Sequence, residues 1–247
     1  MTITSVREPF HPLALTTWLR TTALLAVFFL GAGASLQAGL RDFARLETLA
    51  TERFGPDAAR RVGNWKALLA QAASLDERRQ IRTVNEFFNR NVVYRSDPEL
   101  WGLPDYWATP LETLGKAAGD CEDYAIAKYT SLRKLGIPDS RLRIFYVHAR
   151  LGALAGGDAT EVHMVLGYYP TEDAEPLILD NLITDIRPAS RRDDLTPIFS
   201  FNSEGLWADG STTSAGDPTA RLSNWRGVLE RMRAEGINLD RPIPAGE

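Results

Sequence analysis

The sequence predicts an α+β protein in which a helical N-terminal part packs on an antiparallel β-sheet. Apolar residues recur at helical spacing up to Leu135, and beyond Leu142 they alternate with polar ones in segments rich in β-branched and aromatic residues. Helices that come first and closely spaced strands that come second are typical of an α+β fold rather than of alternating βα units. A chain of 247 residues with 44% apolar and 24% charged side chains has the composition of a folded protein.

Residues 1–38 are predicted to be a secretory signal. The run from Thr21 to Ala34 holds about 14 largely apolar residues, which fits the ~7–15 of a signal-peptide core better than the ~20 of a spanning helix. Small residues follow the run, and we expect cleavage after Ala34 or Ala38. An uncleaved membrane anchor is the alternative. Residues 39–247 are then expected to form a single domain.

The helical part is predicted to contain four segments and one long loop. Residues 40–54 form a helix, Asn64 caps a second helix over 65–73, and Asp76 starts a third over 77–92. A loop rich in proline and aromatic residues covers 96–114. Asp120 to Leu135 forms a helix that Gly136 and Pro138 end.

The sheet part is predicted to begin with an antiparallel hairpin. Its strands cover 142–150 and 161–169, joined by a Gly-rich turn over 152–158. A third strand covers 176–182, and 184–187 is a candidate extension of the sheet. Polar loops are expected at 188–194 and 209–219, and an amphipathic helix at 221–235 closes the domain.

Charge and cysteine content exclude several functions. The net charge is −4, which gives no electrostatic reason to expect DNA or RNA as a partner, because phosphate binding needs a concentrated basic face. One cysteine cannot form an internal disulfide, and three histidines (His11, His148 and His163) make a Cys/His zinc cluster hard to assemble. A single thiol in an exported protein is either buried and inert or a working thiolate.

Three residues stand where activated-thiol chemistry would need them. Cys121 lies in the first turn of its helix, where unpaired N–H groups and the helix dipole favour a thiolate. His163 lies within the second strand, and Asp180 ends the apolar run of the third. Each residue alone has an ordinary structural explanation, but together they match a nucleophile, a base and its orienting carboxylate. His148 with Asp158 is a weaker choice, because Asp158 lies in the Gly-rich turn.

These positions also carry a resemblance to a known family. The segments 119–125, 128–129 and 135–137 around Cys121 are similar to those of the bacterial transglutaminase-like cysteine proteinases, the LapG-type periplasmic proteases. Residues 105–110, 161–165, 179–181 and 201–207 resemble the same family, so the likeness extends over roughly residues 40–210. It implies a papain/transglutaminase-like fold.

The resemblance implies roles for individual residues. Cys121 would be the nucleophile, His163 the general base and acid, and Asp180 the residue that orients His163. A calcium site beside the nucleophile would use Asp120, Glu122 and Asp123, whose hard oxygen ligands suit Ca²⁺. The alternative is that Asp120 caps the helix while the other two carboxylates stabilise its dipole. The Cys121 N–H would stabilise the oxyanion, with Trp101, Trp107 or an Asn of residues 89–91 as the second donor.

The family further implies a substrate, a partner and a compartment. The substrate would be a large surface adhesin, cut near its N-terminus in the periplasm so that it is released and a biofilm disperses. An inner-membrane cyclic-di-GMP receptor of the LapD type would sequester the protease. Two other functions stay open, a transglutaminase-type acyl transferase and a non-catalytic calcium-dependent binding module.

Overall fold

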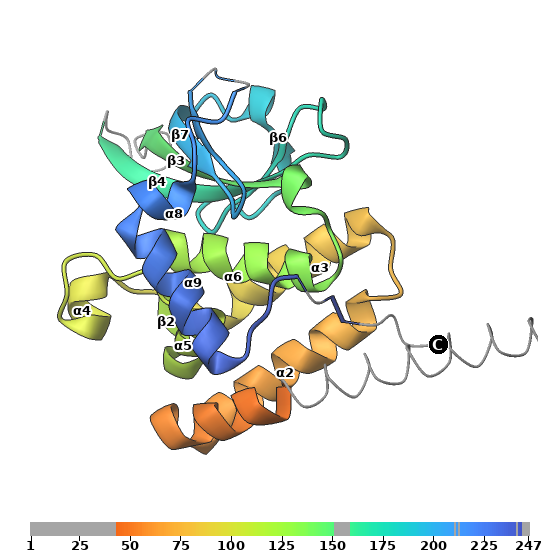
Figure 1. Cartoon of the computed structure of the whole chain (residues 1–247), viewed down its shortest axis with the longest axis vertical. Helices are drawn as coiled ribbons and strands as arrows, with labels where there is room; N and C mark the ends of the chain where they lie inside the picture. The colour runs from red at the N-terminus through yellow and green to blue at the C-terminus, as the bar shows by residue number, and fades with distance from the viewer. Residues whose placement is uncertain (1–42, 151–158, 210, 212, 241, 244–247) are drawn as a thin grey trace, which may run out of the picture.

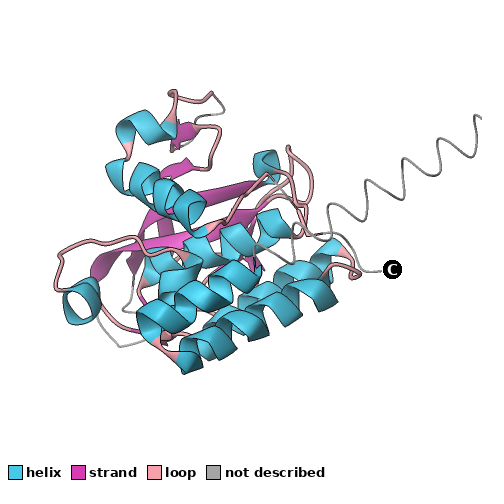
Figure 2. Cartoon of the chain, turned by 60° about the horizontal axis from the view of Figure 1, so that its bottom comes forward, coloured by secondary structure: helices cyan, strands magenta, loops and turns pink. Residues whose placement is uncertain are grey.

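The computed structural model describes residues 43–150, 159–209, 211, 213–240 and 242–243. The expected signal over 1–38 and the turn over 152–158 lie outside these residues. Helices form one layer and a twisted sheet forms the other (Figures 1 and 2). This arrangement confirms the predicted α+β class, with helices packed on an antiparallel sheet. Within the described residues, no helix combines the length and hydrophobicity that a membrane crossing requires.

The helical layer begins with residues 43–54, which are helical as expected. Five helices follow it before the main sheet: α2 (Pro56–Ala72), α3 (Glu77–Asn91), α4 (Asp97–Trp101), α5 (Pro110–Lys116) and α6 (Cys121–Lys134). Helix α9 (Ser223–Glu235) follows the sheet. The short α8 (Pro218–Arg221) precedes α9. The Asp76 side chain caps α3 by accepting a hydrogen bond from the Arg79 N–H, as predicted.

The start of α2 differs from the prediction. The helix begins at Pro56 rather than after Asn64, because proline suits the first turn of a helix and Gly55 enters it with a φ of 88°. Gly63 and Asn64 therefore lie inside the helix. A larger residue would fit at Gly63, since the nearest atom to an added Cβ is Glu47 Oε1 at 3.9 Å.

The aromatic loop predicted over 96–114 contains two short helices. Both α4 and α5 begin with proline in the first turn, so the prolines that suggested a loop are helix starts. Thr109 and Glu112 form a reciprocal capping box at α5: the Thr109 hydroxyl accepts from the Glu112 N–H, and the Glu112 carboxylate accepts from the Thr109 N–H. A single-turn helix lacks the apolar periodicity from which longer helices are predicted.

The main sheet has six antiparallel strands in the order β6-β5-β4-β3-β7-β8. The hairpin of β3 (Leu142–Arg150) and β4 (Thr160–Tyr168) forms its centre, as predicted. The third strand is shorter than expected, because β5 covers only Leu177–Leu179 and pairs with β4 from Leu166 to Tyr168. The edge strand β6 is Arg187–Pro188. The prediction missed β7 (Leu195–Phe201) and β8 (Leu206–Ala208), which pair on the other side of β3.

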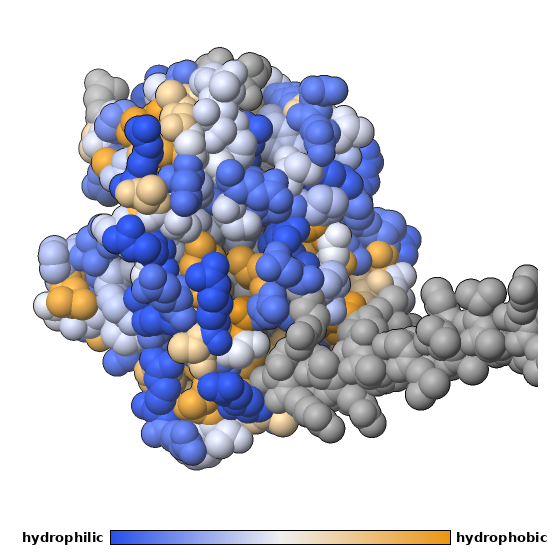
Figure 3. All heavy atoms as spheres, in the orientation of Figure 1, coloured by the Kyte–Doolittle hydropathy of each residue, from blue (hydrophilic) through white to orange (hydrophobic). Residues whose placement is uncertain are grey.

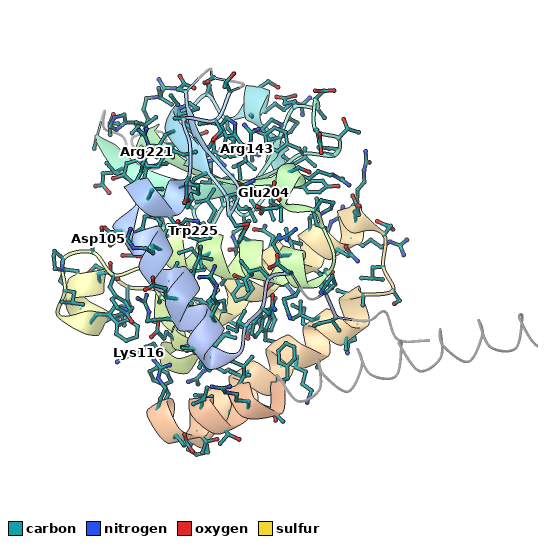
Figure 4. The ribbon with its side chains drawn as sticks, in the orientation of Figure 1. Asp105, Lys116, Arg143, Glu204, Arg221 and Trp225 are labelled. Atoms are coloured by element: carbon teal, nitrogen blue, oxygen red, sulfur yellow. The ribbon has the colours of Figure 1, made fainter. Side chains whose placement is uncertain are left out.

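Helix α6 lies between the sheet and the other helices and packs against β3 and β4. Most residues of α6 are buried, so this helix forms the centre of the core. Tyr129 of α6 packs against Trp225 of α9 with ring centroids 5.7 Å apart. Trp225 projects from α9 toward α6 and the sheet (Figure 4), and its indole N–H donates to the Asn202 carbonyl. On the face shown in Figure 3, apolar side chains are scattered among hydrophilic ones. A small parallel pair, β1 (Val93–Tyr94) with β2 (Ala118–Gly119), leads into α6.

Candidate active site

The sulfur of Cys121 lies where α6 begins beside the sheet. Asp120 is the N-cap residue and Cys121 the first residue of the helix. The sulfur accepts a hydrogen bond from the Met164 N–H of β4, the residue that follows His163. The residue as a whole is partly buried. Thus the structure brings Cys121 to the strand that carries His163, beside the carboxylate of Glu122.

His163 and Asp180 form a buried hydrogen-bonded pair. The ring Nε2 lies 2.8 Å from Asp180 Oδ1, and the two residues are 4% and 1% exposed. Burial opposes ionisation of Asp180, but its hydrogen bond with His163 and the charges around it keep its pKa below the ordinary value. An ionised carboxylate can only accept, so the ring donates its Nε2–H. The Nδ1 atom is then the nitrogen with a free lone pair, which is what a proton acceptor requires.

Asp180 is held from several sides. Its Oδ1 also accepts from the Leu182 N–H at 3.0 Å, and its Oδ2 accepts from Arg192 Nη2 at 2.7 Å. Its backbone carbonyl accepts from Asn89 Nδ2 at 2.8 Å and from Lys128 Nζ at 3.1 Å. Burial lowers the pKa of Lys128 to about 7, against the attraction of Asp180. The contacts to the carbonyl come from α3 and α6 and fix the backbone of Asp180. The contacts with His163, Leu182 and Arg192 fix the orientation of its carboxylate.

Cys121 is not hydrogen-bonded to His163. In the part of the chain that the structure describes, the thiol donates to Glu122 Oε2 at 3.0 Å instead. Burial, and then the negative charge of Glu122, raise the pKa of the Cys121 thiol well above its usual value. The pair of residues predicted to exchange a proton is therefore close in the fold but not joined, and the carboxylate beside the sulfur keeps the thiol protonated.

The relation of the three residues to the sheet explains this arrangement. Side chains alternate along a strand, so Met164 and Leu166 join the core under α6 while Val165 joins the small apolar cluster on the other face. His163 shares the face of Val165. The Met164 N–H lies in the plane of the sheet, and β5 leaves that stretch of β4 unpaired. The sulfur consequently occupies the open edge of β4, between the two faces.

A group of three carboxylates surrounds the start of α6. One oxygen each from Asp97, Asp120 and Glu122 lies within 4.8 Å of the others. Burial, and then neighbouring carboxylates, raise the pKa of Asp120 to about 9, and burial raises that of Asp97 to about 6. Buried oxygens of Asp97 and Asp120 have no hydrogen-bond partner in the described residues.

This group fits a divalent cation. Two oxygens that bind one Ca²⁺ at 2.3–2.6 Å lie no more than about 5 Å apart, which matches the group. Asp120 does not cap α6 through its side chain, so the capping explanation of this residue fails. The unpartnered buried oxygens and the crowded negative charge would both be relieved by a cation.

Asp123, which the sequence interpretation also proposed as a ligand, lies next to this group and keeps that proposed role, because its Oδ2 is buried without a hydrogen-bond partner in the described residues. Its Oδ1 accepts from the Ala108 N–H at 2.7 Å, and the Asp120 N–H also donates to this carboxylate. The side chain packs against Gly119, where an added Cβ would lie 2.6 Å from Asp123 Oδ2. The Oδ1 atom of Asp123 therefore ties the start of α6 to the segment before α5, and Asp97 is a further carboxylate beside Asp120 and Glu122 that the sequence did not indicate.

Most donors considered for the second oxyanion position have other partners. The Trp107 indole donates to Asp105, Asn89 to the Asp180 carbonyl and Asn91 to the Phe87 carbonyl. The buried Trp101 indole has no partner in the described residues. The Cys121 N–H, at the first helical position, is likewise not donated to any described group.

His148 is exposed on β3, and Asp158 lies outside the described residues, so the alternative pair has no structural support.

Two residues of the site were missed by the sequence interpretation. Asp97 precedes a proline and read as a turn residue, and Arg192 belonged to a stretch of charged residues that read as a polar loop. Arg192 is 3% exposed. Nothing within a single sequence distinguishes either one from a solvated charge.

Comparisons with known proteins identify the family of this chain. The sequence profile of the bacterial transglutaminase-like cysteine proteinases matches residues 62–195. Legionella pneumophila LapG in an EGTA-treated form is 38% identical over 77% of this chain and 97% of that one, with a TM-score of 0.66. The calcium-bound form of the same protein is 37% identical over 77% of this chain and 98% of that one, with a TM-score of 0.64. The comparison with curated proteins finds no match.

The profile covers more than half of the chain, and the LapG structures share both its fold and over a third of its aligned residues. The chain therefore belongs to the bacterial transglutaminase-like cysteine proteinase family, has the transglutaminase-like fold and is a cysteine protease.

Proposed function

We propose that this chain is a calcium-dependent periplasmic endopeptidase that cleaves the N-terminal region of a large cell-surface adhesin and so promotes biofilm dispersal. The observation that carries the proposal is the buried His163–Asp180 pair, 2.8 Å between ring and carboxylate, on the sheet beside Cys121 at a helix start. Cys121, His163 and Asp180 form the catalytic triad in this proposal. The similarity to LapG supports the choice of an adhesin-processing protease.

The proposed reaction follows from the atoms that are free. His163 Nδ1 takes the proton of Cys121, and the thiolate attacks the scissile carbonyl carbon. The Cys121 N–H donates to the oxyanion that forms. His163 then gives the proton to the leaving amine, and water hydrolyses the thioester with His163 again as base. Asp180 stabilises the protonated ring and holds its Nε2–H throughout.

Asp120, Glu122 and Asp123, together with Asp97, would hold the calcium ion, which when bound supplies positive charge beside the nucleophile. Ca²⁺ takes 6–8 oxygen ligands, so backbone carbonyls or waters would complete the shell. Glu122 is also the acceptor of the thiol hydrogen. Its engagement as a ligand would leave that hydrogen available to His163.

The periplasmic location rests on the signal predicted over residues 1–38. As a partner we propose an inner-membrane receptor of the LapD type, which sequesters the protease when cyclic-di-GMP is bound in the cytoplasm. This part of the proposal follows from the family, since the described surface contributes no contact with a partner chain.

The test combines purified protein with the N-terminal region of a giant adhesin encoded beside it. Cleavage in calcium, its loss in EGTA and its loss in Cys121→Ala support the proposal. Incorporation of a fluorescent amine without chain cleavage would instead identify an acyl transferase. Unchanged function in Cys121→Ser would leave only a calcium-dependent binding module, and cleavage unaffected by EGTA would remove the metal from the reaction.

A further inference from the structure

The ion pairs around Asp180 extend beyond the predicted triad. Arg192 Nη2 donates to Asp180 Oδ2 at 2.7 Å on the side of the carboxylate opposite to His163. The same guanidinium donates through Nε to Asp194 Oδ1 at 2.9 Å and through Nη2 to Asp194 Oδ2 at 2.7 Å. His163, Asp180, Arg192 and Asp194 are therefore linked in a row, the last two from the segment between β6 and β7.

Arg192 is unlike the other arginines that line the cavity beside His163. This cavity of about 170 Å³ is also lined by Arg150, Arg187 and Arg191, and all three are exposed. Arg192 is 3% exposed, and its Nη2 and Nε are taken by two carboxylates. Its Nη1 has no hydrogen-bond partner in the described residues but is buried, and the contact that links the guanidinium to the predicted triad is the one with Asp180.

The backbone around Arg192 is also fixed. The Arg192 N–H donates to the Ala189 carbonyl at 2.9 Å, and its own carbonyl accepts from the Leu195 N–H at 3.0 Å, where β7 begins. The Arg150 N–H donates to the Asp194 carbonyl at 2.9 Å, which ties the same turn to β3. The guanidinium is thus anchored to the central strands and not to a free loop.

We propose that Arg192 is a positioning residue of this protease: its guanidinium, braced by Asp194, fixes the Asp180 carboxylate so that Oδ1 faces the Nε2–H of His163. An aspartate that made only the His163 bond could rotate about its Cβ–Cγ bond and present either oxygen. With Oδ2 bound to Arg192 and Oδ1 to the Leu182 N–H, one orientation remains. Arg192 also keeps the buried carboxylate ionised, which the bond to the ring requires.

Asp194 has a separate part in this arrangement. A buried arginine paired only with Asp180 would neutralise that carboxylate and weaken its attraction for a protonated His163. Because the guanidinium is shared with Asp194, Asp180 keeps part of that attraction. Asp194 is more exposed than Asp180, so it can hold its charge without a further partner.

The activity readout rests on the proposed adhesin cleavage, so a second readout is needed that does not. The chain has only three histidines, so ¹⁵N-histidine labelling gives few ring signals, and a His163→Asn variant assigns the one from His163. Its Nε2–H, buried and bonded to a carboxylate, should be strongly deshielded and slow to exchange. This signal reports the His163–Asp180 bond even if the substrate has been chosen wrongly.

Arg192→Met should reduce kcat by roughly 10- to 100-fold with little change in KM, since small misplacements of a catalytic group cost rates of this order. The His163 ring N–H signal should move or broaden. Arg191→Met is the matched control, because Arg191 is the neighbouring residue, is exposed and lines the same cavity. We expect it to keep both kcat and the ring signal.

A double-mutant cycle separates positioning from a general structural effect. In the Asp180→Asn background, Arg192→Met should cause no further loss of kcat, because its route to the ring is already broken. An equal loss in both backgrounds would overturn the proposal. So would an unchanged ring signal together with an unchanged kcat in Arg192→Met.

Conservative variants keep the proposal testable if Arg192→Met fails to fold. Arg192→Lys retains the charge and the buried stem but cannot span two carboxylates with a planar fork. Arg192→Lys and Asp194→Asn, made as two separate variants, should each show an intermediate kcat and a displaced His163 ring signal. Full kcat and an unaltered signal in both variants would refute the positioning role.

Discussion

Replacing Asp97 with asparagine should change stability and calcium binding in opposite directions. In chelator, Asp97 is a buried carboxylate crowded by Asp120 and Glu122, and burial raises its pKa from the ordinary 3.8 to about 6. Such a rise makes the ionised form about 3 kcal/mol less favourable in the folded protein than in the unfolded chain. Asparagine keeps an oxygen that can accept the Tyr106 N–H, which now bonds Asp97 Oδ2, but it removes the charge.

The sign follows from linkage. A carboxyl whose pKa is raised on folding binds its proton more tightly in the folded state, so stability falls as the pH rises from about 4 to about 6 and stays lower above it. At pH 7 in EGTA, Asp97→Asn should therefore be more stable than wild type by up to about 3 kcal/mol. For a chain of this size the melting temperature should rise by about 6–12 °C. At pH 4 the difference should nearly vanish.

In calcium the order should reverse. A divalent cation within 4 Å of a unit charge gains about 2 kcal/mol even at the dielectric constant of water, which is about 30-fold in dissociation constant. Titration calorimetry on Asp97→Asn should show at least that loss of calcium affinity. Glu99→Gln is the matched control, since Glu99 is an exposed acid of the same helix, with an ion pair to Arg95 of only 3.9 Å. An Asp97→Asn protein that is less stable in EGTA and binds calcium normally would refute the assignment of Asp97 to the site.

Three further predictions test other parts of the structure. Cys121→Ala and His163→Ala should each lower kcat by roughly 10⁴-fold or more while the circular dichroism spectrum stays that of the folded protein, and appreciable residual turnover in either would contradict the triad. Gly119→Ala should lower the free energy of unfolding in urea by about 1–3 kcal/mol, because the new Cβ would lie 2.6 Å from Asp123 Oδ2. Gly63→Ala, in the uncrowded interior of α2, should raise it by about 0.5–1 kcal/mol. Equal effects of the two substitutions would disprove the close packing at Gly119. Glu77 accepts hydrogen bonds from Arg141, which together with Tyr168 keep its pKa below the ordinary 4.5, so it stabilises the fold above that pH and the contribution is lost as the pH falls through the lowered pKa. The Glu77 side chain is 44% exposed, so Glu77→Gln should lower the free energy of unfolding by no more than about 1 kcal/mol at pH 7. The difference from wild type should shrink below pH 4.5, and a difference that grew there would contradict the Arg141–Glu77 ion pair.

The elements that the sequence predicted well are those with strong local signals. Helix α3 and strand β3 carry long apolar patterns of one period, and their ends have a capping aspartate or a clear change of period. The start of α2 was misplaced because Asn64 resembles a cap while the actual start, Gly55 followed by Pro56, resembles a break. Strands β7 and β8 were missed because Pro197 interrupts one and the other has only three residues; their pairing with β3 comes from tertiary contacts.

The candidate site divides in the same way. Cys121, His163 and Asp180 could be proposed from the sequence because each stands at a distinctive position within a predictable element, and the structure joins His163 to Asp180. Asp97 could not be identified, because it reaches the carboxylate group only through the path of the segment between β1 and α5. Asp123 stays a proposed ligand: its Oδ1 accepts from the Ala108 N–H, a contact that the sequence did not indicate, while its Oδ2 is buried without a partner in the described residues.

The length of β5 explains how a sheet made of ordinary hairpins presents this chemistry. In the register that β5 sets with β4, continued pairing would place Asp180 opposite Val165, Asn181 opposite Met164 and Leu182 opposite His163. The Met164 N–H would then be consumed within the sheet, and the sulfur of Cys121 could not reach the strand. Because the pairing stops at Leu179, the chain bends away, and Asp180 turns its carboxylate to the ring of His163 while its carbonyl is held by α3 and α6. The departure of one strand thus opens the edge of β4 to the sulfur of Cys121 and brings the Asp180 carboxylate to His163, and Arg192 binds that carboxylate where the sheet no longer does.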